Sequence, residues 1–210
     1  MAAKDTQPDQ PQLYLITPAE FELDVFPNLL ASVLDAHPIA CVRMAMASQD
    51  EQRLSKAADA LREVTHARDV ALVIEDHIPL VERLGLDGVH LSDGAHQVRY
   101  ARKELGPDAI VGVHSSTSRH DGMGAGEAGA DYVCFGPVRE STLGDGSFAE
   151  TDLFEWWSEV IEVPVVAEGL LNLEMIKTLT PMTDFFAIGD EIWSTDDPVA
   201  ALTTLREAMS

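Results

Sequence analysis

Short apolar runs recur along the chain, and each is followed by a segment with the periodicity of an amphipathic helix. The clearest runs, 88–91 and 131–135, each begin just after a glycine that ends a helical segment and finish in a polar or Gly/Pro turn. Because they are apolar rather than alternating, they are typical of parallel strands buried on both faces. We predict eight strands, at 13–16, 39–46, 70–74, 88–91, 109–114, 131–135, 163–167 and 184–188.

Helix signals fill the segments between these runs. Helical spacing of apolar residues indicates helices over about 24–36, 51–64, 77–84, 98–105, 118–128, 153–160, 172–179 and 196–205. Ser48 and Glu51 have the spacing of a capping box. The fifth helix contains Gly122, Gly124 and Gly126, each of which costs up to ~1 kcal/mol relative to alanine. We therefore expect that helix to be short or irregular.

Eight strand-then-helix units predict an α/β fold, a single (β/α)8 TIM barrel that forms one domain over residues 12–210. A doubly wound sheet is the alternative, because its parallel strands have the same sequence pattern. No Gly-x-Gly-x-x-Gly motif follows the first strand, which disfavours that alternative. Residues 1–11 are polar with two prolines, and we expect a disordered N-terminal tail there.

The composition limits where the protein is expected to be located and which partners it is expected to bind. The formal charge is −22, from 14 basic and 36 acidic residues, and it opposes binding to nucleic acid. No apolar run approaches the ~20 residues of a membrane span, and the first eleven residues lack a signal-like apolar segment, so we expect a cytoplasmic protein that does not enter membranes. Cys41 and Cys134 lie in apolar runs and are expected to be buried, reduced thiols.

The C-terminal ends of the strands are where a TIM barrel places its active site, and we expect a small-molecule ligand at that mouth. His114 ends a strand beside the hydroxyls of Ser115 and Thr117, so these three are candidate catalytic residues. His90 has a simpler interpretation as a hydrogen-bonded packing group. The other segments at the mouth are 43–47, 75–76, 91–93, 136–140, 168–171 and 189–191.

Several segments also carry a family resemblance. Leu13-Tyr-Leu-Ile-Thr17, Asp87-Gly-Val-His-Leu91 and Gly129-Ala-Asp-Tyr-Val133 resemble strands of the thiamine-phosphate synthase and thiazole tautomerase family, as do Gly106–Ile110, Gly136-Pro137 and Val163–Ala167. Each match is weak alone, and their order and spacing make the set specific. The resemblance implies a barrel enzyme, a transferase of thiamine biosynthesis, that joins a pyrimidine pyrophosphate to a thiazole phosphate with Mg²⁺. A homodimer is one possible assembly.

The resemblance also implies a set of site residues. It places Asp76 at a metal position, with Asp93 as a second metal ligand only if its loop shifts, because Ala95 replaces the usual carboxylate. Arg43 is the remaining cation of a pyrophosphate motif in which Ala45 and Ala47 replace the other members. The residues expected to bind substrate are Arg43, Glu75, His90, Gly136, Glu168, Gly169, Gly189 and Asp190.

The departures from the family gather where phosphate should bind. Ser141–Gly144 lacks the lysine of the family's phosphate loop, and Glu168 and Asp190 stand beside the loops after the seventh and eighth strands. A carboxylate about 4 Å from a phosphate charge costs roughly 4 kcal/mol at an effective dielectric near 20. Alternatively, Glu168 or Asp190 turns to solvent or pairs with Arg43, which would leave the backbone N–H groups of these loops usable.

The family resemblance, together with these departures from it, leaves three alternative functions. The chain is a thiamine-phosphate synthase with altered ligands and reduced activity, a barrel enzyme for a different, cationic or metal-bound small molecule, or a non-catalytic relative that binds a ligand. Fold alone does not separate them. We also expect Glu75, Asp76, Asp93, Glu168 and Asp190 to meet at the mouth and raise one another's pKa values, as a cluster suited to Mg²⁺ or Ca²⁺ would.

Overall fold

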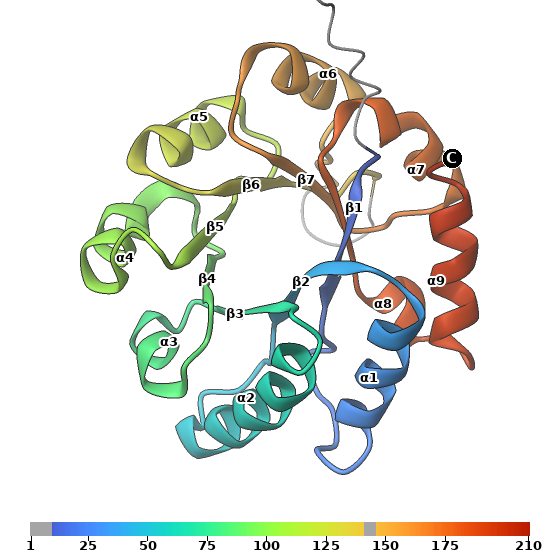
Figure 1. Ribbon diagram of the computed structural model, residues 1–210. Coiled ribbons are helices and arrows are strands. Elements are labelled where there is room, and N and C mark those ends of the chain that lie inside the picture. The colour runs from blue at the N-terminus through green and yellow to red at the C-terminus, as the bar shows by residue number, and fades with distance from the viewer. Residues whose placement is uncertain (1–9, 141–145) are drawn as a thin grey trace, which may run out of the picture.

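The computed structural model describes residues 10–140 and 146–210, and its strands form a closed parallel barrel. Neighbours pair in sequence order from β1 to β8, and β8 pairs with β1 to complete the ring (Figure 1). The (β/α)8 TIM-barrel prediction is therefore confirmed, and the doubly wound sheet is wrong. The strands are β1 (Gln12–Ile16), β2 (Ile39–Met44), β3 (Ala71–Glu75), β4 (Gly88–Leu91), β5 (Ile110–His114), β6 (Tyr132–Phe135), β7 (Val165–Glu168) and β8 (Phe185–Ile188).

The helices form an outer ring around the strands (Figure 1). Most of them follow the sequence prediction to within a few residues. Two short 3-10 turns, η1 (Gly94–Gln97) and η2 (Thr180–Met182), and the short helix α8 were not predicted. The helices are α1 (Phe26–Ala36), α2 (Glu51–His66), α3 (Ile78–Leu84), α4 (Val98–Leu105), α5 (Arg119–Ala128), α6 (Thr151–Val160), α7 (Leu173–Leu179), α8 (Asp190–Trp193) and α9 (Pro198–Glu207).

Two helix predictions need correction. The cap of α2 is Asp50, whose side chain accepts hydrogen bonds from the backbone N–H groups of Gln52 and Arg53, so the capping box at Ser48 is wrong. Helix α5 is a regular ten-residue helix despite its glycines. Gly122 explains part of this tolerance, because a Cβ there would lie 2.7 Å from the ring of Phe135. Close packing against β6 therefore offsets the low helix propensity.

The sheet has two different faces. Its outer face packs against the helices in one large apolar cluster, whereas its inner face holds a small cluster of Tyr14, Val73, Tyr132, Cys134, Val166 and Ala187. Three buried charged or polar side chains, Arg43, His90 and Glu168, share the buried strands with them. Gly112 on β5 makes room for this interior, since a Cβ there would lie 1.9 Å from the Tyr132 ring. The barrel centre is thus packed with both apolar and polar side chains.

The remaining sequence predictions have different outcomes in the structure. Most of the predicted tail, residues 1–9, lies outside the described residues, as does the 141–144 segment compared with a phosphate loop. Pro11 is buried and Gln10 contacts the Met209 carbonyl, so the tail prediction is wrong at its last two residues. Both cysteines are free thiols, as predicted, but only Cys134 is buried, whereas Cys41 is half-buried. Within the described part of the chain, no helix is long and apolar enough to cross a membrane.

Candidate functional site

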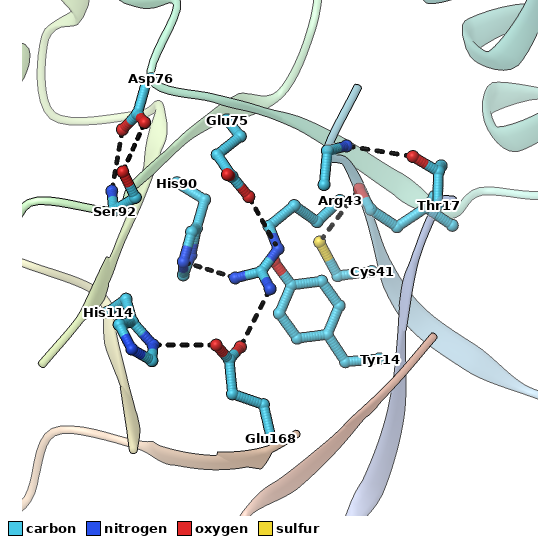
Figure 2. Close-up of polar contacts among 12 residues, drawn as sticks. Tyr14, Thr17, Cys41, Arg43, Glu75, Asp76, His90, Ser92, His114 and Glu168 are labelled. Atoms are coloured by element: carbon cyan, nitrogen blue, oxygen red, sulfur yellow. Dashed lines mark hydrogen bonds and ion pairs between the residues drawn. The ribbon is translucent and has the colours of Figure 1, made fainter. Parts of the chain in front are cut away.

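Arg43 stands at the centre of the predicted site, inside the barrel. Its guanidinium contacts His90 Nε2 through Nη1 at 2.5 Å and Glu168 Oε2 through Nη2 at 3.0 Å (Figure 2). Its Nε lies 3.5 Å from Glu75 Oε2, an ion-pair contact rather than a hydrogen bond. Arg43 is only 5% exposed. The one cation that the resemblance leaves for pyrophosphate is therefore already paired with the protein's own carboxylates.

The hydrogen bonds around Arg43 fix the proton on His90. An arginine only donates, so His90 Nε2 must accept and the ring must be neutral. His90 Nδ1 then carries the proton and donates to the Tyr132 hydroxyl at 3.1 Å, which leaves Tyr132 to donate to the Tyr14 hydroxyl at 2.8 Å. Burial, followed by the nearby Arg43 charge, lowers the pKa of His90 well below its usual value, which agrees with a neutral ring. His90 is thus a buried link in a polar chain.

Glu168 ends β7 and points inward. Burial alone would raise its pKa, but the charge of Arg43 and the contact with His114 outweigh burial and hold the pKa below its usual range. Our expectation that acidic neighbours raise the pKa of this carboxylate is therefore wrong. Glu168 is ionised and faces Arg43 and His114 (Figure 2), which is the alternative arrangement that the sequence left open.

Glu75 ends β3 above the guanidinium and behaves differently. Its pKa is raised, first by burial and then by the charges of Asp76 and Glu168, although Arg43 acts in the opposite direction. Of the five carboxylates expected to cluster, Glu75 and Glu168 share Arg43, while Asp76, Asp93 and Asp190 are exposed. The expected repulsion among the carboxylates thus contributes at Glu75, where burial is the larger cause.

His114 ends β5 next to Glu168. Its Nδ1 lies 2.8 Å from Glu168 Oε1, although the two groups are not aligned for a full hydrogen bond. A carboxylate oxygen this close requires a proton on Nδ1, so Nε2 is the nitrogen left for exchange with a ligand. Ser115 is buried with no partner for its hydroxyl among the described residues, and Thr117 is half-buried. The three candidate catalytic residues thus lie at the end of β5 and in the turn that follows it.

Asp76 is the predicted metal ligand that the structure holds most firmly. It has a left-handed backbone (φ 57°), and its carboxylate accepts the Ser92 backbone N–H at 2.8 Å and the Ser92 hydroxyl at 2.5 Å (Figure 2). A carboxylate has about four lone-pair sites, so two remain for a cation. Mg²⁺ needs few protein ligands because it is commonly held by one or two carboxylates together with substrate phosphates. Asp76 fits such a role.

The other metal candidates fit less well. Asp93 is exposed and accepts a hydrogen bond from Gln97 Nε2 at 3.1 Å. In the described ranges, the group of ligand-type side chains close enough for one ion is His90, Cys134 and Glu168. That group is buried, and burial, followed by the charge of Glu168, raises the pKa of the Cys134 thiol well above its usual value. A protonated thiol beside Arg43 does not suit a cation, so Asp76 is the better position.

The loops after β7 and β8 lie beside each other, and they contain a residue whose role the sequence did not reveal. Glu191 accepts the Leu171 backbone N–H through Oε1 at 3.1 Å and the Gly189 backbone N–H through Oε2 at 2.9 Å. Asp190, which we expected at this position, is exposed to solvent. Glu191 lies on the unpredicted helix α8, which is why the sequence placed it near the mouth without assigning its contacts.

The two other glycines of the predicted site have packing roles. A Cβ on Gly136 would lie 2.2 Å from the Glu168 carbonyl oxygen, so only glycine lets the end of β6 approach β7 this closely. Gly169 has a left-handed backbone (φ 77°), and a Cβ there would lie 3.2 Å from Pro137 Cα. Both residues therefore set the position of Glu168, whether or not they contact a ligand.

Comparisons with known proteins agree with this architecture. The sequence model of the family described as thiamine monophosphate synthase matches residues 13–188. A thiamine-phosphate synthase of Rhodospirillum centenum is 38% identical, covering 94% of this chain and 97% of that protein, and one of Erythrobacter litoralis is 39% identical, covering 90% and 91%. A solved thiamine phosphate pyrophosphorylase of Pyrococcus furiosus has the same fold, with a TM-score of 0.80, 21% identity and coverage of 94% and 95%. The chain belongs to the thiamine monophosphate synthase family.

Proposed function

We propose that this chain is a transferase of the thiamine-phosphate synthase type, which joins a pyrimidine pyrophosphate to a thiazole at the C-terminal mouth of the barrel. The observation that carries the proposal is the match to relatives of that name over at least nine-tenths of both chains. The geometry supports it at two points of the mouth. Asp76 presents an anchored carboxylate, and His114 presents a ring nitrogen next to an ionised Glu168.

The residues around the mouth suggest a division of roles. Asp76 would hold Mg²⁺ together with substrate phosphate oxygens, and the ion would neutralise charge on the departing pyrophosphate. Glu168 keeps the proton of His114 on Nδ1, so that His114 Nε2 can exchange a proton with the ligand. Arg43 and Glu75 would shape the electric field beneath the ligand and would not bind an anion directly. This role is supported by the ion pairs of Arg43 with Glu75 and Glu168 inside the barrel.

We propose that turnover is low compared with that of ordinary members of the family. Ala45 and Ala47 lack the donors that the resemblance leads one to expect, and the Arg43 charge is balanced by Glu168 and Glu75. Each lost preorganised contact to a developing anion typically costs ~10²- to 10³-fold in rate. Two such losses would leave a slow enzyme with an intact fold.

A coupling assay tests this proposal. The pyrimidine pyrophosphate and excess Mg²⁺ are supplied with either the thiazole phosphate or the thiazole alcohol, and the coupled product and released pyrophosphate are measured. We expect slow turnover that Asp76→Ala abolishes and that Asp93→Ala, a matched loss of one exposed carboxylate, leaves largely unchanged. Absence of product with both acceptors from a folded protein would contradict the transferase proposal and favour a ligand-binding role.

Metal dependence and location belong to the same proposal. Chelation of divalent ions should stop the reaction and Mg²⁺ should restore it, because the Asp76 carboxylate repels pyrophosphate unless a cation lies between them. We also propose a cytoplasmic location, with which the acidic composition is consistent. The homodimer stays a prediction, which a sedimentation measurement would test.

A further inference from the structure

Glu191 binds two backbone N–H groups that come from different loops. The donors are Leu171, three residues after the end of β7, and Gly189, directly after β8, and each bonds a different oxygen of the same carboxylate, at 3.1 and 2.9 Å. Leu171 and Gly189 are both buried. Gly169 and Leu170 hold the first loop in left-handed conformations, with φ values of 77° and 59°. The two loops thus form a small anion site, and the protein's own carboxylate fills it.

The position of this anion site is informative. In TIM barrels, the loops after strands 7 and 8 are the usual place where backbone N–H groups bind a substrate phosphate. Two N–H groups shared between the two oxygens of one carboxylate resemble the contacts that two phosphate oxygens would make. Glu191 therefore holds two N–H groups in the part of the mouth where TIM barrels usually bind phosphate.

The surroundings of Glu191 also disfavour a phosphate. Residues 169–172 and 189–197 contain no lysine, arginine or histidine, but they contain four acidic residues, Asp190, Glu191, Asp196 and Asp197. Leu170 and Leu173 are each more than 40% exposed on the β7 side. A phosphate placed here would meet like charge and apolar side chains. Two like charges about 4 Å apart, at an effective dielectric near 20, weaken binding roughly 10³-fold.

We propose that Glu191 permanently occupies the anion position at this end of the mouth, so that the ligand group bound there is an uncharged alcohol rather than a phosphate ester. The inference rests on the proposed function in naming the ligand, which is then the thiazole alcohol. Glu191 is accordingly a specificity-determining residue. It excludes phosphate by charge and by using the two N–H groups that would recognise it.

The test is a titration of the full-length, ¹⁵N-labelled protein with inorganic phosphate, followed through the amide signals of Leu171 and Gly189. In the unmodified protein these two signals should not respond below millimolar phosphate. In Glu191→Ala, both should shift saturably, with an apparent affinity at least tenfold tighter. Asp190→Ala removes the same charge from the exposed neighbouring residue, and it should behave like the unmodified protein.

Each other result overturns the inference. Equal responses of the unmodified protein and Glu191→Ala would show that Glu191 swings aside for phosphate. No response in Glu191→Ala would show that the N–H pair is not an anion site, and Glu191→Ser, which also removes both carboxylate oxygens, repeats the test if the alanine variant unfolds. An equal gain in phosphate affinity in Asp190→Ala would show that the effect comes from net charge alone. Because this titration needs no turnover, its failure is distinguishable from failure of the coupling assay.

Discussion

Glu168 and Glu191 are two carboxylates at the same mouth that bind different kinds of hydrogen-bond donor. Glu168 is buried and faces a side-chain cation, Arg43, whereas Glu191 is half-buried and faces two backbone N–H groups. Removing Glu168 would leave a buried charge without its partner, while removing Glu191 would leave two neutral donors near solvent. Loss of Glu168 should therefore cost more stability than loss of Glu191, and loss of Glu191 should mainly change which ligand binds.

The largest expected effect comes from breaking the interior pair. Glu168→Gln should lower the free energy of unfolding by about 3–5 kcal/mol, because it leaves the Arg43 charge buried and uncompensated. Urea unfolding followed by circular dichroism measures this change. A double variant, Arg43→Met with Glu168→Leu, should recover most of the loss. A loss below about 1 kcal/mol for Glu168→Gln would show that the pair is solvated.

The pH dependence of stability sharpens the same comparison. The pKa of Glu168 is lower in the folded protein than its unfolded value of about 4.3, so its stabilisation is fully present above that pH and is lost as the pH falls toward the folded pKa. Glu75, whose pKa is raised, contributes with the opposite sign. Unfolding measured from pH 7 down to 3 should show the gap between the wild type and Glu168→Gln shrinking below about pH 4.3. A difference in unfolding free energy that stays constant with pH would contradict the pairing of an ionised Glu168 with Arg43.

A backbone substitution tests whether Glu168 depends on its strand neighbours. Gly136→Ala should destabilise the fold by about 1–3 kcal/mol, because its Cβ would lie 2.2 Å from the Glu168 carbonyl oxygen. Gly124→Ala is the matched control. The nearest atom to its Cβ is 3.9 Å away, so this change should be neutral or stabilising by up to ~1 kcal/mol. Thermal unfolding distinguishes the two, and equal effects would refute the close approach of β6 and β7.

The smallest effect is expected on the Glu191 side. Glu191→Gln should change the free energy of unfolding by about 1 kcal/mol or less, since an amide oxygen keeps one N–H contact and water can reach the site. The same urea experiment measures it. A loss as large as that of Glu168→Gln would show that Glu191 is a structural residue. The two carboxylates would then not differ in their contribution to stability.

The barrel was predictable because its signals are local. Eight apolar runs separated by helical periodicity sufficed, and β4 matches its predicted bounds while the other strands differ by a residue or two. The interior layer was also accessible in principle. Side chains alternate between the two faces of a strand, so Arg43 faces inward with Tyr14 and Cys41, and Glu168 faces inward with Val166.

The contacts of Glu191 were not predictable in the same way. They depend on a left-handed turn at Gly169 and Leu170, on a four-residue helix too short for a periodic signal, and on the proximity of two loops separated by a helix. From the sequence we expected Glu168 and Asp190 to exclude phosphate from this position, whereas the carboxylate that contacts the N–H groups of both loops is Glu191. Side-chain direction in loops is decided by tertiary contacts that no local pattern records.

The most direct test of the account is the ratio of kcat/KM for the thiazole alcohol to kcat/KM for the thiazole phosphate, measured with a fixed concentration of the pyrimidine pyrophosphate and Mg²⁺. We predict that the unmodified protein prefers the alcohol by at least tenfold and that Glu191→Ala shifts the ratio toward the phosphate by a similar factor, while Asp190→Ala leaves it unchanged. A preference of the unmodified protein for the thiazole phosphate would contradict the claim that Glu191 fills the phosphate position.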